Sequence, residues 1–227
     1  MTGRGAFDGV LDGLGAAIVS GRVPAGHVES VEAIVARTGV SRSIVREAVR
    51  VLVAAGLLSA GRRVGLRVLP DTSWDALNAD VIRWRLDAPS RAAQLTELIE
   101  VRLAFEPPAA AAAALRRTDA EAARLSELAD AIAAAASPDA FFAADVGFHS
   151  LLLACSRNAM FARLQTVVAE ALRERSLGGH PRYPADPRDV ELHGLIAAAV
   201  GAERPQEASA RTRELVERNS NRPALPR

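Results

Sequence analysis

The sequence predicts a mainly α-helical protein, in which three helices and a two-stranded hairpin are followed by an all-helical bundle of six or seven helices. Three observations favour this fold class. Apolar residues recur at intervals of three and four along most of the chain, and aromatic residues make up only 4% of it. One short segment alternates apolar and basic residues around two glycines. The core must therefore consist mainly of alanine, leucine and valine, which suits closely packed helices.

Length and charge indicate two parts with different partners. The 227 residues suit one large domain or two small ones. Residues 1–70 contain nine arginines and five acidic residues, a net charge of +4, whereas residues 71–227 contain 19 arginines and 22 acidic residues, a net charge of −3. This asymmetry predicts that the first part meets a polyanion and that the second does not.

We expect a cytoplasmic protein with no membrane partner. Cys155 is the only cysteine, so no internal disulfide can form, and it is interpreted as a small buried hydrophobe. The N-terminus has no signal-peptide apolar region, and no apolar run reaches the roughly 18 residues of a transmembrane helix.

The first helices are predicted from their apolar spacing and their end signals. Residues 6–21 have apolar side chains at intervals of three and four, which indicates an amphipathic helix. Residues 22–28 are expected to form a connector, and residues 30–37 a second helix that stops at Gly39. Ser41 is expected to cap a third helix that ends near residue 55.

The third helix carries an apolar stripe beside an arginine stripe. The apolar stripe is Val45, Ala48, Val49 and Leu52, and the polar stripe is Arg42, Ser43, Arg46 and Arg50. One interpretation is a solvated face, because Glu47 could pair with Arg46 or Arg50. The other is DNA recognition, since a short turn between two helices is typical of a helix-turn-helix and arginine pairs bidentately with guanine.

The predicted hairpin favours the DNA-binding interpretation. Arg62, Arg63 and Arg67 surround Gly61 and Gly65 in "GRRVGLRV". A basic two-stranded flap beside a recognition helix is a wing, which can reach a minor groove or phosphates. The first part is therefore predicted to be a winged helix-turn-helix.

The segment "GVSRSIVREAVRVLVAAGLL", followed by "RVGLRV", resembles the winged-helix domain of the GntR family of bacterial transcription regulators over residues 6–69. The resemblance implies operator contacts by Ser41, Arg42, Ser43 and Arg46, with Gly65 at the wing tip. The further DNA-binding candidates are Arg50, Arg63 and Arg67. Glu32 stands where the family often has a basic residue, so one DNA contact is expected to be missing and the operator to differ from the commonest one.

The remaining chain is predicted to be helical. Residues 1–70 form the expected DNA-binding domain, 71–90 a linker with two tryptophans, 91–219 a helical domain and 220–227 a tail. Helix breaks are expected at 107–108, 118–119, 137–138, 156–158, 178–187 and 201–205, where prolines, glycines or capping residues occur.

Three residues of the helical part could hold a divalent metal. Asp145 and His149 lie four residues apart, so their side chains leave the same face of a helix, and His193 lies on another helix between apolar residues. A carboxylate with two imidazoles suits Zn²⁺ or another borderline ion and leaves open positions for water or a ligand. The alternative is that the two histidines are satisfied core residues.

Residues 91–219 resemble the FCD effector domain of the FadR-like branch of the GntR family, through "ELIEVRLAFEPPAAAAAA", "DVGFH", "SRNAMF" and "ELHGLIAAAV". The resemblance implies that Asp145, His149 and His193 are metal ligands, with zinc the expected ion and nickel or manganese as alternatives. Leu215 stands where many relatives have a further histidine. We therefore expect three protein ligands, with Glu214 as a less favoured substitute and His180 as a surface-loop residue.

Arg102 and Asn158 are the other candidates in this part. Arg102 lies in a largely apolar helix and could form a buried pair with Glu106 or Glu100, or bind an effector carboxylate, which is the role that the resemblance implies. An arginine and a divalent cation in one cavity favour an anionic ligand with a carboxylate and a hydroxyl group. Asn158 is expected to cap or orient the site helix.

The linker narrows the effector class. "WDALNADVIRWRL" resembles the corresponding segment of the sugar-acid-responsive branch, which includes regulators that respond to galactonate. Trp74 and Trp84 are expected to pack the two domains rather than to contact the effector. Lactate and dicarboxylates remain open as alternative effectors.

Together these features predict a ligand-responsive transcription regulator, a repressor rather than an enzyme. It would bind a palindromic operator as a homodimer and respond to a small carboxylate bound near the metal. Two alternatives remain open at this point. One is a metal-dependent hydrolase in the helical domain, and the other is a constitutive DNA-binding dimer without an effector.

Overall fold

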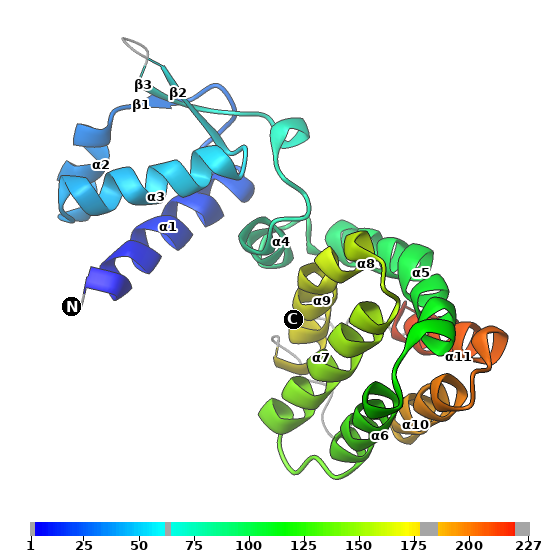
Figure 1. Ribbon diagram of the computed structural model, residues 1–227. Helices are drawn as coiled ribbons and strands as arrows, with labels where there is room; N and C mark the ends of the chain where they lie inside the picture. Colours follow the sequence, from blue (N-terminus) through cyan, green and yellow to red (C-terminus); the bar gives the residue numbers. More distant parts are fainter. Residues whose placement is uncertain (1–2, 62–64, 178–185, 221–227) are drawn as a thin grey trace. The chain divides into compact units, whose positions relative to one another are not determined.

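The computed structural model describes residues 3–61, 65–177 and 186–220 and divides into two units, residues 1–94 and residues 95–227 (Figure 1). The predicted fold class is confirmed, because helices dominate the described residues and one small sheet lies in the first unit. None of the described helices is both long and apolar enough to span a bilayer.

The first unit is built around three helices and a fourth that follows the sheet. These are α1 (Gly3–Val19), α2 (Val31–Thr38), α3 (Arg42–Ala54) and α4 (Ala79–Leu86). Helix α1 packs against both α3 and α4 (Figure 1). Leu11 and Ile18 of α1 are buried in one cluster with Val45 and Leu52 of α3, so the apolar faces predicted for both helices are confirmed.

The turn between α2 and α3 follows from its end residues. Ser30 caps α2 by accepting from the backbone N–H of Ala33, and Gly39 ends it in the left-handed region at φ 67°. Ser41 occupies the N-cap position of α3, as expected, but its side chain makes no capping hydrogen bond. Its hydroxyl group lies instead 3.1 Å from that of Ser43.

The sheet contains the predicted hairpin and one strand that was not expected. β1 (Val28–Glu29), β2 (Leu58–Gly61) and β3 (Gly65–Val68) are antiparallel in the order β1-β3-β2. β1 takes the last residue of the expected connector, because a two-residue strand shows no alternation in sequence. Leu66 and Val68 are buried and Arg67 is exposed, as expected for a one-sided hairpin.

The segment expected to be a linker has structure of its own. A 3-10 helix (Asp71–Ser73) precedes α4, which Asn78 caps. Trp84 lies against Gly15 of α1, and its indole N–H donates to Asp12 over 3.0 Å. Trp74 donates to the carbonyl of Leu69. Both tryptophans thus have contacts within the first unit.

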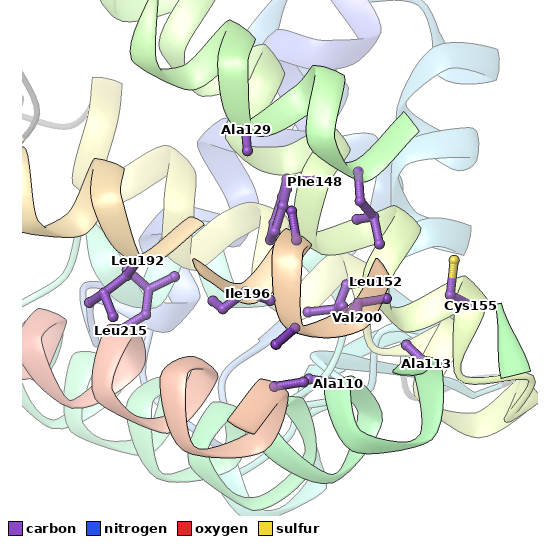
Figure 2. Packing of buried hydrophobic residues seen from close by; sticks show 14 of the residues in the cluster. Ala110, Ala113, Ala129, Phe148, Leu152, Cys155, Leu192, Ile196, Val200 and Leu215 are labelled. Carbon is purple, nitrogen blue, oxygen red and sulfur yellow. The ribbon is translucent and has the colours of Figure 1, made fainter. Parts of the chain in front are cut away.

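The second part of the chain contains seven helices within the described ranges, the upper end of the prediction. They are α5 (Arg91–Arg116), α6 (Asp119–Ala133), α7 (Pro138–Cys155), α8 (Ala159–Arg163), α9 (Gln165–Leu177), α10 (Pro187–Gly201) and α11 (Pro205–Ser220). Helix α10 packs against α6 and α11, and α7 packs against α6 and α9. Figure 2 shows Leu192 and Leu215 towards one end of the shared core and Cys155 towards the other.

The predicted break at residues 107–108 is wrong, because α5 continues through both prolines. Each proline removes one backbone donor, which normally disfavours a helix interior. Of the six alanines that follow, four are buried at 0–1% exposure: Ala109, Ala110, Ala113 and Ala114. Packing of this face offsets the lost hydrogen bonds, so tertiary contacts override the local signal. A break at Leu164, between α8 and α9, was not predicted.

Candidate DNA-binding face and metal centre

The polar stripe of α3 lies on its exposed side. Ser41, Arg42, Ser43, Arg46 and Arg50 are all exposed, while the opposite stripe of the same helix is buried. Arg50 pairs with Glu47 over 2.7 Å, one of the pairs that the sequence allowed. Arg46 has no salt-bridge partner within the described ranges, whereas Arg42 and Arg50 each pair with a glutamate. Of these three arginines, Arg46 is therefore the one whose guanidinium group is most available to bind DNA.

Glu32 of α2 forms an ion pair with Arg42 of α3. The Nη2 atom of Arg42 lies 2.5 Å from Oε1 of Glu32, and the two side chains are 64% and 60% exposed. An exposed pair of this kind contributes little to stability. The acidic residue at this position therefore lies directly against one of the predicted operator contacts.

The hairpin brings one further basic residue to an exposed position. Arg67 lies on β3 next to β1 and β2, paired in register with Val28 and Ser59. Gly65 begins β3 at φ 84°, and a Cβ atom there would lie 3.0 Å from the carbonyl oxygen of Glu29. Arg62 and Arg63 fall outside the described residues.

The three predicted metal ligands come together in the helical unit. Asp145 and His149 lie on α7 and His193 on α10, and each is at most 1% exposed. One candidate ligand atom from each residue can be chosen so that all three lie within 4.8 Å of one another. The spacing of four residues on α7 and the separate histidine on α10 therefore meet at one buried point.

Phe148 packs edge-on against both imidazole rings. Its ring meets His193 edge-on at 5.1 Å between centroids and His149 at 5.8 Å, with an angle of 79° in both cases. The two imidazole rings themselves are nearly perpendicular, at 88° and 5.5 Å. Because Phe148 is fully buried, it limits the rotation of both rings.

Each imidazole has its Nε2 atom towards Asp145 and its Nδ1 atom towards another oxygen. Oδ1 of Asp145 lies 3.1 Å from Nε2 of His193 and 3.4 Å from Nε2 of His149. The Nδ1 atom of His193 lies 2.7 Å from the backbone carbonyl of Asp189, and that of His149 lies 2.7 Å from Oε2 of Glu106.

These distances fit a divalent ion. Bonds of about 2.0–2.1 Å separate neighbouring ligand atoms by about 3.3 Å in a tetrahedral shell and about 2.9 Å in an octahedral one. Both ring nitrogens of His149 are buried without an aligned hydrogen-bond partner among the described residues. A buried nitrogen that faces a carboxylate and lacks a partner is the condition that a metal ion would relieve.

Glu106 belongs to the site, although its place in the sequence indicated only a pairing with Arg102. It lies on α5, is 0% exposed, and contacts both His149 and Arg102. The Nε atom of Arg102 donates to Oε1 of Glu106, so the buried pair considered from the sequence forms with Glu106. The sequence signal for this pair was the spacing of four residues, which places Glu106 one helical turn after Arg102 on α5.

The electrostatics of this group depend on burial and on charge. Burial alone would raise the pKa of Glu106, but the charges of Arg102 and His149 lower it to about 2. Burial alone would lower the pKa of His149, but the carboxylates of Glu106 and Asp145 outweigh it and raise that pKa. The carboxylate of Glu106 is therefore ionised at neutral pH.

The other candidates lie apart from this cluster. Leu215 is fully buried in the apolar core, and Glu214 accepts from Arg188 over 2.6 Å instead of facing the histidines. Asn158 caps α8 by accepting from the backbone N–H of Met160. His180 falls outside the described residues.

A surface pocket in this unit lies away from the candidate ligands. It has a volume of about 530 Å³ and is lined by residues of α5 and α11, among them Ala111, Ser209 and Arg213. None of Asp145, His149, His193 or Arg102 lines it. The pocket contains Arg213 but none of the three candidate metal ligands, so the buried cluster is the candidate metal site.

Comparison with known families assigns both parts of the chain. Residues 8–68 match the bacterial regulatory proteins of the gntR family, and residues 97–218 match the FCD domain. The galactonate operon transcriptional repressor of Escherichia coli (strain K12) is 30% identical over 168 residues, which cover 73% of each chain. The HTH-type transcriptional regulator YieP of the same strain is 33% identical over 90 residues, 40% of this chain and 39% of YieP.

Solved structures share the fold at lower identity. Lar, which controls the expression of the Listeria monocytogenes agr system, matches with a TM-score of 0.60 at 17% identity. The match covers 97% of this chain and 95% of Lar. McbR/YncC of E. coli has a TM-score of 0.51 at 19% identity and covers 95% of each chain. These likenesses concern the fold alone.

Proposed function

Because the chain belongs to the GntR family of bacterial regulatory proteins and carries an FCD domain, we propose that it is a transcription repressor that a small organic acid releases from its operator. Residues 1–70 would bind DNA, and residues 91–219 would bind the effector and form a homodimer. The observation that carries this proposal is the exposed arginine face of α3 above a fully buried apolar face.

DNA recognition would proceed through the start of α3. An exposed helix held on α1 and α2 can enter a major groove with its N-terminal residues foremost. Ser41, Arg42, Ser43 and Arg46 occupy that end, and Arg50 lies one turn further on. Gly65 and Arg67 would bring the hairpin to the adjacent backbone, with Arg63 as a further candidate. Two copies on a palindrome would double this small contact area.

The effector site would combine a metal with Arg102. We assign a divalent ion, zinc with nickel or manganese as alternatives, to Asp145, His149 and His193. When bound, the ion supplies positive charge that favours a ligand with a carboxylate and a hydroxyl group. The similarity to the galactonate operon repressor supports a sugar acid as the first effector to test.

Burial of the site supports a conformational response. The side chain of Arg102 is 3% exposed, and Asp145 and His193 are 0% exposed. An organic acid can reach these groups only in a more open arrangement of the helices. Binding would shift the population towards that arrangement, which gives effector binding a physical route to alter the dimer.

The DNA-binding part is tested with an operator selected from random duplexes by the purified protein. Arg46→Ala should weaken binding to that duplex by about 1–3 kcal/mol if Arg46 pairs with a base. Arg124→Ala removes the same charge from an exposed position on α6 and should leave affinity unchanged. Equal affinities of the two variants would refute the role of α3.

The effector part is tested by titrating galactonate, gluconate and lactate into the protein–operator complex with zinc present. Release by one acid, lost on Arg102→Ala in a protein that still binds operator, is the expected result. Release that persists in that variant would remove Arg102 from the site. Failure of every organic acid in a wider screen would favour a constitutive DNA-binding dimer.

A further inference from the structure

We propose that Glu106 is the positioning residue of the metal site, because its carboxylate faces Nδ1 of His149 and would hold that ring with Nε2 towards the ion. The inference deepens the proposed function and rests on its metal site. It assigns a role to a residue on α5, a helix that contributes none of the three candidate metal ligands.

The first support is the matching arrangement of the two histidines. Each has Nε2 within 3.4 Å of Oδ1 of Asp145 and Nδ1 at 2.7 Å from another oxygen. For His193 that oxygen is the carbonyl of Asp189, in the preceding turn of its own helix. For His149 it is the side chain of Glu106, which comes from a different helix.

The second support is the hydrogen bonding of His149. Both of its ring nitrogens are buried without an aligned partner among the described residues, although Glu106 lies at 2.7 Å. A neutral imidazole that ligates through Nε2 carries its hydrogen on Nδ1 and usually donates it to a carboxylate or carbonyl. A small rotation of the ring would thus give both nitrogens a partner when the ion is present.

The third support is the way Glu106 is held. Its carboxylate is 0% exposed and receives the guanidinium group of Arg102, through Nε to Oε1 and through Nη2 to Oε2 at 3.5 Å. A buried, paired carboxylate keeps a fixed position. The same contact links the metal ligand His149 to Arg102, which is the proposed effector residue.

The experiment measures Co²⁺ affinity and the Co²⁺ absorption spectrum of the full-length protein. Glu106→Ala should weaken Co²⁺ binding by about 10–100-fold and alter the ligand-field bands, because His149 is no longer oriented. Glu106→Gln keeps an acceptor oxygen and should lose less. Glu100→Gln, an exposed carboxylate on the same helix, is the control and should match the wild type.

A variant that leaves Arg102 buried without a partner can unfold. The double variant Arg102→Leu/Glu106→Leu removes both charges together, which is often tolerated where a buried ion pair is replaced by apolar residues. Its far-ultraviolet circular dichroism reports folding, and its Co²⁺ affinity should fall as in Glu106→Ala. Glu106→Gln is expected to lose Co²⁺ affinity by a smaller but measurable factor, because an amide oxygen is a weaker acceptor than a carboxylate. If neither Glu106→Ala nor the double variant folds, unchanged affinity and spectrum in Glu106→Gln would overturn the proposal.

The outcomes separate this proposal from the proposed function. Wild-type protein that binds no Co²⁺ would overturn the metal site and the role of Glu106 together. Binding that His193→Ala abolishes, with folded Glu106 variants that match the wild type in affinity and spectrum, would overturn only the positioning role. Loss in the Glu106 variants with an unchanged Glu100→Gln protein supports it.

Discussion

Replacing Gly15 by alanine tests the packing of α4 on α1. A Cβ atom at Gly15 would lie 2.4 Å from Cη2 and Cζ2 of Trp84 and 2.6 Å from Cε2. Carbon atoms in contact are normally about 3.5–4.0 Å apart. The indole ring of Trp84, which is hydrogen-bonded to Asp12 and belongs to a residue only 3% exposed, would have to move by about 1 Å.

The expected cost can be worked out from opposing effects. Overpacking costs about 1–3 kcal/mol, and loss of the Trp84–Asp12 hydrogen bond about 0.5–1.5 kcal/mol. Alanine in place of glycine favours the helix by about 0.5–1 kcal/mol. We therefore expect Gly15→Ala to lower the free energy of unfolding of the first unit by about 2 kcal/mol, within limits of about 0.5 and 4 kcal/mol.

Urea denaturation followed by tryptophan fluorescence measures this change. Both tryptophans of the chain, Trp74 and Trp84, lie in the first unit, so their emission reports on that unit. Gly13→Ala is the control, because a Cβ atom there meets nothing within 4 Å and should raise stability by about 0.5–1 kcal/mol. If Gly15→Ala proves as stable as Gly13→Ala, the packing argument is refuted.

Three further predictions concern single side chains. Glu32→Gln should release Arg42 from its ion pair and strengthen binding to random duplexes. If Arg42 then reaches a phosphate, the plot of log affinity against log salt concentration should become steeper by about one unit, and an unchanged slope would contradict this. Cys155 should resist iodoacetamide at pH 8 until urea unfolds the protein, because it is buried and burial raises its thiol pKa to about 11. Because the pKa of Glu106 falls from 4.5 to about 2 on folding, its stabilising effect is complete above pH 4.5 and is lost as the pH falls towards 2. In circular-dichroism melts of metal-free protein, the midpoint temperature should fall less between pH 4.5 and 2 for Glu106→Gln than for the wild type. An equal fall in the two proteins would argue against the lowered pKa.

The DNA-binding half was largely predictable because its signals are local. The apolar and arginine stripes of α3 follow from helical spacing alone, Gly39 marks the end of α2, and Gly61 and Gly65 mark the paired ends of β2 and β3. β1 was not predictable, since two residues paired across a long sequence separation show no pattern. Ser41 shows that a residue suited to capping can occupy the N-cap position without making the bond.

The helical half shows where sequence reasoning stops. Asp145 and His149 could be paired from their spacing on one helix, whereas Glu106 reaches His149 from a helix about 40 positions earlier. Long-range contacts of this kind depend on how helices pack, which spacing within one helix does not encode. The continuous α5 has the same cause, because the burial of its alanines outweighs two prolines.

The closed surroundings of Asp145, His149 and His193 have a kinetic consequence. Phe148 and the neighbouring helices leave these side chains with at most 2% of their surface open to water. An ion held there could leave only during transient opening of the bundle, so chelators would strip it at the rate of that opening, not of diffusion. The rate of metal removal by a chelator would then measure how often the helices of this unit separate.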